Sequence, residues 1–178
     1  MNKNEARKSF LEYLKKEHIK YKLINEKEAV IAVDEIDVVY LSCRMEDVIG
    51  RHIETTIRFY ENNCYCQSYY CQPLADTVEK KCAASCACNY LNLYTPWNSN
   101  AIIEHYFFCD DETGDIFNGC QIPYQWFDTA FDEVVYHILN YGVNQISAVC
   151  IPIVFYLEGK YTYEEFKEWL QDNLLAGC

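Results

Sequence analysis

The chain has 178 residues, which is enough for one hydrophobic core and short for two, so we expect a single domain over residues 1–178. Apolar residues make up 51% of it, which argues against disorder. The net charge is 15 − 27 = −12, and an acidic surface repels phosphate backbones, so we expect no nucleic-acid partner. The charge serves either solubility alone or recognition of a basic partner.

The sequence predicts a cytoplasmic location. The N-terminus, Met1 to Lys8, is charged and has no apolar segment of the kind found in signal peptides. The longest apolar run, Ile146 to Leu157, is too short to span a bilayer and is typical of a buried helix end, so we expect no membrane partner. Eleven cysteines are an odd number, and in a reducing compartment we expect most of them to pack as small apolar residues.

The first elements change from helical to strand periodicity. Apolar residues at spacings of three and four predict a helix over residues 4–19. Residues 21–24 and 29–33 flank the polar stretch 25–28 and predict a hairpin. Residues 36–41 form a third β-branched run, which predicts a further strand.

A second hairpin and a small-residue helix follow. Residues 53–71 alternate around the turn residues 61–63 and predict the hairpin. Asp76, with Glu79 three positions later, predicts a capped helix that ends near Leu93. We expect the buried stripe of this helix to comprise Leu74, Val78, Cys82 and Cys86.

The clearest hairpin joins residues 102–108 to residues 116–122, with Gly114 at the left-handed position of its turn. The acidic run 110–115 between them does not fit an EF-hand, because its sixth position is not glycine. The run therefore predicts a solvated turn rather than a calcium site.

The last third of the chain predicts two helices. Asp128 is expected to cap a long helix whose apolar period continues to Ile153. Gly142 is expected to loosen this helix, and Pro152 to bend or end it. Thr162-Tyr163-Glu164-Glu165 is a capping box that predicts the start of a short final helix.

The order of elements predicts an α+β fold with an antiparallel sheet flanked by helices: a helix, hairpins, a helix, a further hairpin and two helices. The features that carry a resemblance are Tyr90-Leu91-Asn92, Phe107-Phe108-Cys109-Asp110, Glu112-Thr113-Gly114-Asp115-Ile116, the long helix after Phe127 and Tyr156-Leu157-Glu158-Gly159-Lys160. On these residues the chain resembles the YbjN-like family, whose fold is similar to that of class I type III secretion chaperones. The resemblance implies a non-enzymatic, often dimeric regulator or chaperone-like adaptor and carries over no catalytic residue.

The strongest metal candidate is the trio Cys82, Cys86 and Cys88, with Cys64 and Cys66 as a second pair. Cys88 would lie about 200° from Cys86 around a regular helix, so ligands from this helix would diverge. We therefore expect packed thiols, with no metal and no other cofactor.

A catalytic cysteine needs a base nearby, and the four histidines are scattered along the chain. His105 is adjacent to Glu104 on a predicted strand, so their side chains should point to opposite faces. We expect the histidines to be surface residues or satisfied core residues. The sequence therefore predicts no catalytic residues and no enzyme.

Aromatic residues are the better functional indication, with 16 Tyr, nine Phe and three Trp. They serve either core packing or a protein-binding and dimer surface. We predict a non-enzymatic protein-binding module, an adaptor or chaperone-like regulator that forms a homodimer and binds a protein partner. The predicted partner surface comprises Tyr65, Tyr69, Tyr94, Trp97, Tyr124 and Trp126. The alternatives are an immunity or antitoxin-like protein that neutralises a basic partner, and a thiol- or metal-dependent enzyme that uses residues 82–88.

Overall fold

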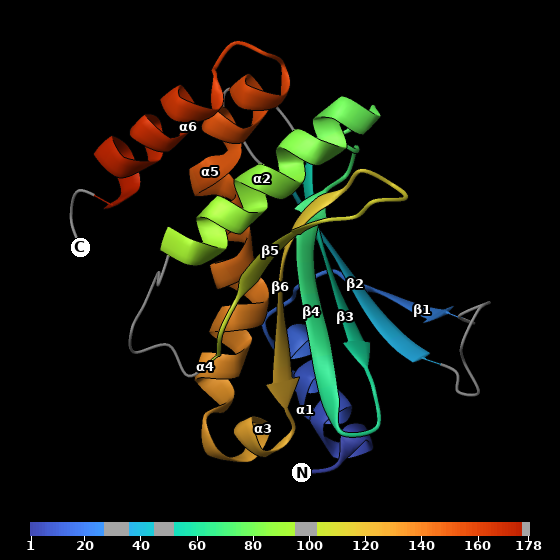
Figure 1. Ribbon diagram of the computed structural model, residues 1–178. Helices are drawn as coiled ribbons and strands as arrows, with labels where there is room; N and C mark the ends of the chain where they lie inside the picture. The colour runs from blue at the N-terminus through green and yellow to red at the C-terminus, as the bar shows by residue number, and fades with distance from the viewer. Residues whose placement is uncertain (27–35, 45–51, 95–102, 176–178) are drawn as a thin grey trace.

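The strands form one antiparallel sheet in the order β1-β2-β3-β4-β6-β5 (Figure 1). The computed structural model describes residues 1–26, 36–44, 52–94 and 103–175. Its strands are β1 (Lys22–Glu26), β2 (Ile36–Arg44), β3 (His52–Phe59), β4 (Asn63–Tyr70), β5 (Tyr106–Cys109) and β6 (Ile116–Pro123). The predicted α+β class with an antiparallel sheet is confirmed.

The helices supply the other half of the fold. They are α1 (Lys3–Lys16), α2 (Val78–Tyr94), α3 (Gln125–Thr129), α4 (Phe131–Tyr136), α5 (Gly142–Leu157) and α6 (Tyr163–Leu170), with π-helical turns η1 (His137–Tyr141) and η2 (Gln171–Leu175). The helices α1 to α6 contribute to two clusters of buried residues. Both clusters lie on the same face of the sheet, behind which α1, α4 and α5 are seen in Figure 1.

The opposite face of the sheet, which we call the open face, is not covered by any helix of the described segments. Along β4, Cys64 and the alternate residues up to Tyr70 are buried, whereas Tyr65, Gln67 and Tyr69 point to the open face. The strand register places Tyr106 and Phe108 of β5 on the open face as well. Aromatic rings from two non-adjacent strands therefore share the open face.

The N-terminal elements follow the predictions closely. α1 ends at Lys16, three residues before the predicted end, and His18 then takes the left-handed backbone conformation with φ +56°. β1 covers the first predicted strand, but Asn25-Glu26 continue it and pair with β2 instead of turning. The predicted strand at residues 29–33 lies outside the described residues.

The start of α2 is capped by a different residue from the one expected. The Thr77 hydroxyl accepts a hydrogen bond from the Lys80 amide at 3.2 Å. Asp76 instead forms an ion pair with the Lys80 ammonium group at 2.7 Å. Thr77 therefore takes the capping position that the sequence assigned to Asp76.

The buried face of α2 also differs from the predicted stripe. Val78, Cys82 and Cys86 are exposed, and only Leu74, which precedes the helix, is buried as expected. The small side chains of this helix give its faces little contrast in hydrophobicity, so contacts with β5 and α5 decide which face is covered. The buried residues of α2 are Ala84, Ala87, Cys88, Tyr90 and Leu91.

Two local predictions are confirmed. Gly114 has φ +76° in the turn between β5 and β6, although β5 itself starts only at Tyr106. Thr162 caps α6 in a capping box: its hydroxyl accepts from the Glu165 backbone N–H, and the Glu165 carboxylate accepts from the Thr162 backbone N–H.

The long helical run over residues 131–157 departs from its prediction at both ends. Asp128 lies inside α3 and forms an ion pair with the amino group of Met1, while α4 starts without a side-chain cap. α5 continues through Pro152 to Leu157, so the helix does not end at the proline. Gly142 begins α5 directly after the π-helical turn.

By length and composition, this run could cross a membrane, which the shorter apolar stretch seen in the sequence could not. Half of its most apolar window is buried inside the protein, and core helices of soluble proteins meet the same criterion.

Candidate functional site

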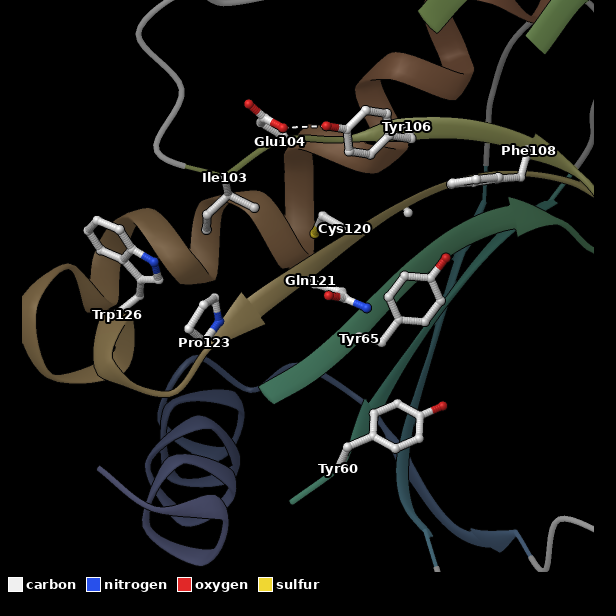
Figure 2. A pocket seen from close by; sticks show the side chains of 11 residues that line it. Tyr60, Tyr65, Ile103, Glu104, Tyr106, Phe108, Cys120, Gln121, Pro123 and Trp126 are labelled. Carbon is white, nitrogen blue, oxygen red and sulfur yellow. Dashed lines mark hydrogen bonds between the residues drawn. The ribbon is translucent and has the colours of Figure 1, made fainter. Parts of the chain in front are cut away.

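A hollow of about 720 Å³ lies where the open face meets the start of β5 (Figure 2). Aromatic rings surround it, and two of them are well exposed, Tyr106 at 43% and Phe108 at 42%. Tyr65 reaches it from β4 and Trp126 from α3. The other lining residues are Tyr60, Ile103, Glu104, Gly119, Cys120, Gln121 and Pro123.

The hollow and the open face bring together three of the residues predicted for a partner surface. Tyr65 and Tyr69 lie on the open face, where they alternate with buried residues of β4. Trp126 is half-buried at the far end of the hollow. Burial raises the pKa of Tyr69 to about 12.

Tyr124 does not belong to this surface. It is only 4% exposed, and its hydroxyl donates to the carbonyl oxygens of Tyr60 and Asn63, which fixes the turn before β4. The prediction that Tyr124 is exposed to a partner is therefore corrected. The side chain of Tyr94 and the whole of Trp97 lie outside the described part of the chain.

The hollow exists because β5 is shorter than β6. β5 pairs with β6 only from Cys109 opposite Ile116 to Tyr106 opposite Gly119. Both backbone groups of Phe107 bond to Asn92, so Asn118, which lies opposite Phe107, turns its own N–H and C=O toward β4. Backbone groups alternate in direction along an antiparallel strand, so the N–H and C=O of Gln121, three residues later, point away from β4. No described strand pairs with β6 on that side beyond Gly119.

Glu104 is the charged residue in the hollow. It is exposed, and its carboxylate accepts a hydrogen bond from the Tyr106 hydroxyl. This bond and the negative charge raise the pKa of Tyr106. Every other described lining residue is formally neutral at pH 7, so the hollow presents one negative charge among apolar and aromatic groups.

Behind the wall of the hollow lies a hydrogen-bonded pair of histidines, which sequence reasoning missed. His105 Nε2 is 3.0 Å from His137 Nδ1, and the rings stack with centroids 5.1 Å apart. His105 Nδ1 is 2.7 Å from Asn118 Oδ1, and His137 Nε2 is 3.2 Å from Glu133 Oε1. The contacts form a chain from the buried Asn118 to the exposed Glu133.

The residues at the two ends of this series of hydrogen bonds decide which atoms donate and which accept. Because Asn118 Oδ1 accepts from His105 Nδ1, a neutral His105 presents Nε2 as an acceptor to His137 Nδ1–H. His137 can then donate to Glu133 as well only when both of its ring nitrogens are protonated. Burial lowers the pKa of His137, although the negative charge and hydrogen bond of Glu133 act in the opposite direction. Burial and the neighbouring His137 lower the pKa of His105 to about 4, although its bond to Asn118 acts in the opposite direction.

No feature of the local sequence indicates this pair, because its members are 32 residues apart, one just before β5 and the other at the start of η1. His105 and Glu104 do point to opposite faces, as the strand alternation predicts: His105 contacts buried Asn118, and Glu104 contacts exposed Tyr106. A half-buried His105, hydrogen-bonded to Asn118 and His137, therefore anchors the segment that presents Glu104 and Tyr106 to the hollow.

The cysteines named as metal candidates are not brought together. Cys88 is buried, and burial raises its pKa to about 12, whereas Cys82 and Cys86 are exposed and so are not the packed thiols expected. Cys64 and Cys66 belong to the other buried cluster. Within the described segments, no three His, Cys, Asp or Glu side chains are arranged to hold a metal ion.

Comparison of the chain with known proteins returns no match among family models, curated proteins or solved structures. The likeness to the YbjN-like family therefore stays a prediction from the sequence. What can be argued about function comes from the site itself.

Proposed function

We propose that this protein is a non-enzymatic protein-binding module, an adaptor or chaperone-like regulator, and that its contact surface is the open face with the hollow. The observation that carries the proposal is the exposure of Tyr106 and Phe108 beside a hollow of about 720 Å³. Exposed aromatic groups around a concavity are typical of the energetically dominant part of protein interfaces.

The chemistry of the surface supports binding rather than catalysis. Tyr and Phe rings bury large apolar areas with few rotatable bonds, and Tyr keeps a polar end for hydrogen bonding. Burial suppresses ionisation of the Cys88 thiol, which does not suit a nucleophile. The alternative of a thiol-dependent enzyme based on residues 82–88 would therefore have to use the exposed Cys82 or Cys86, and it is not the function that we propose.

Site-specific photo-crosslinking tests the proposal. A benzophenone amino acid at Phe108 samples the open face, and the same group at Tyr136 samples the helical side with matched exposure, 42% against 45%. We expect discrete protein adducts from Phe108 in the native host and none from Tyr136. Absence of an adduct at Phe108, or equal adducts at both positions, would contradict the proposal.

The mass of the adduct also tests the predicted homodimer. A chain of 21.0 kDa that pairs with itself through the open face gives an adduct of twice that mass, and light scattering of the unmodified protein then gives a dimer. A heterologous adduct together with a monomer in light scattering removes the homodimer and keeps the binding module. A basic toxin as the heterologous partner would favour the immunity-like alternative, for which the net charge of −12 is suited.

A further inference from the structure

We propose that the hollow binds an extended peptide of another protein that carries a lysine or arginine, and that this peptide pairs with the free edge of β6 at Gln121. The inference rests on the proposed binding function and names the chemistry of the partner. It comes from three features that meet in the hollow: strand backbone without a described partner, aromatic walls and a single carboxylate.

The backbone of β6 selects an extended chain. The N–H and C=O of Gln121 point toward the hollow, and the strand beyond Gly119 has no described neighbour on that side. A strand added there forms backbone hydrogen bonds whatever its side chains are. The free stretch of β6 runs from Cys120 to Pro123, so at about 3.4 Å per residue it accommodates a strand of roughly four residues.

The side chains around this edge set the pattern of the peptide. Glu104 and Tyr106 are hydrogen-bonded to each other on the open face, so a peptide residue that points to that face meets the carboxylate. The next residue points to the opposite side, toward the apolar groups of Ile103 and Cys120. The matching sequence therefore alternates a basic residue with an apolar or aromatic one.

The negative charge of the hollow favours a basic residue in the peptide over an acidic one. Glu104 is the only formally charged group among the described residues that line the hollow, and the whole chain carries −12. Such a field accelerates association with a cationic peptide and disfavours an anionic one.

Fluorescence anisotropy with two labelled hexapeptides tests the inference on the full-length protein. One peptide alternates Lys with Val and Phe, and the other has Glu in place of every Lys. We expect saturable binding of the lysine peptide and at least tenfold weaker binding of the glutamate peptide. Glu104→Gln should weaken binding of the lysine peptide, and Glu104→Lys should reverse the preference between the two. A preference for the glutamate peptide by the unmodified protein would overturn the inference.

The backbone contact has its own pair of variants. Gln121→Pro removes the free N–H, whereas Gln121→Ala keeps it and shortens the same side chain. We expect Gln121→Pro to weaken binding about tenfold, the effect of one to two hydrogen bonds, and Gln121→Ala to change it less than twofold. If Gln121→Pro does not fold, N-methylation of single peptide amides tests the same bonds with the unmodified protein. Equal binding by the two variants, or indifference to N-methylation at every position, would contradict strand addition.

Failure of the inference is distinguishable from failure of the proposed function. If neither peptide binds but the crosslinker at Phe108 still captures a partner, the open face binds proteins by another mode and the β6 edge is not the site. If Gln121→Pro instead dissolves a dimer of this chain, the occupant of the edge is a second copy, and the proposed peptide of another protein is wrong.

Discussion

Acidification from pH 7 to pH 5 is expected to reduce the free energy of unfolding by about 2 kcal/mol through His105 alone. The pKa of this residue is about 4 in the folded protein, against 6.5 as the ordinary value for histidine. The unfolded chain therefore binds more protons between pH 6.5 and pH 4, and stability falls as the pH is lowered through that range.

The magnitude follows from the two pKa values. A shift of 2.5 pKa units from 6.5 to 4 corresponds to roughly 3 kcal/mol over the whole range, of which about 2 kcal/mol is lost by pH 5. The lowered pKa of His137 adds a loss of the same sign. The lowered pKa of Asp110 acts only when the pH falls through the ordinary range of carboxyl groups, near 4.

Urea unfolding at pH 7, 6 and 5 measures this loss. His105→Gln keeps a neutral polar side chain but cannot titrate, so we expect a less stable protein whose stability changes by about 2 kcal/mol less between pH 7 and pH 5 than that of the unmodified chain. His52→Gln removes an exposed histidine at the start of β3 and serves as the matched control. If His105→Gln and His52→Gln show the same pH dependence, the reasoning about the buried pair is refuted.

Two further predictions concern the frame of the site. Asn92→Ala should destabilise the protein by about 1–2 kcal/mol and speed amide exchange at Phe107, because the Asn92 amide group donates to the Phe107 carbonyl at 2.8 Å and accepts from its N–H at 2.7 Å. Unchanged exchange at Phe107 would contradict that role. Gly114→Ala should destabilise by several kcal/mol more than Gly159→Ala in thermal unfolding. Both glycines have positive φ. A Cβ on Gly114 would lie 2.0 Å from the Ala75 carbonyl oxygen, whereas a Cβ on Gly159 would have no atom of the described residues within 4 Å. Equal losses would show that the contact is relieved.

Local sequence patterns were sufficient to predict the helices and turns, but not which face of a helix is buried. The capping box at Thr162 and the left-handed Gly114 are decided within a few residues, so they could be read from the sequence. The buried face of α2 could not, because alanine and cysteine on both sides leave the choice to tertiary packing. Thr77 and Asp76 are both good caps, and the sequence alone does not say which of them the helix uses.

The site itself depends on contacts that have no local signature. The alternation of β4 places Tyr65 and Tyr69 together, and this much is visible in the sequence. The hollow also needs the late start of β5 at Tyr106 and the turn of the chain that brings Trp126 to the end of β6. The pairing of His105 with His137 needs the packing of the residue before β5 against η1, which only the folded chain supplies.

The β5–β6 hairpin has two stretches of backbone that no described strand pairs with, and their surroundings differ. An edge strand with unpaired backbone is a liability for aggregation, and proteins commonly cover it. At β5 the side chain of Asn92 occupies both edge-facing groups of Phe107, so this stretch is closed to strand addition. One strand further in, no described residue pairs with the backbone of Gln121, which is framed by aromatic rings and the carboxylate of Glu104. A chain that protects one exposed stretch with a dedicated side chain, and surrounds the next with groups suited to recognition, is organised to receive a strand at the second and not at the first.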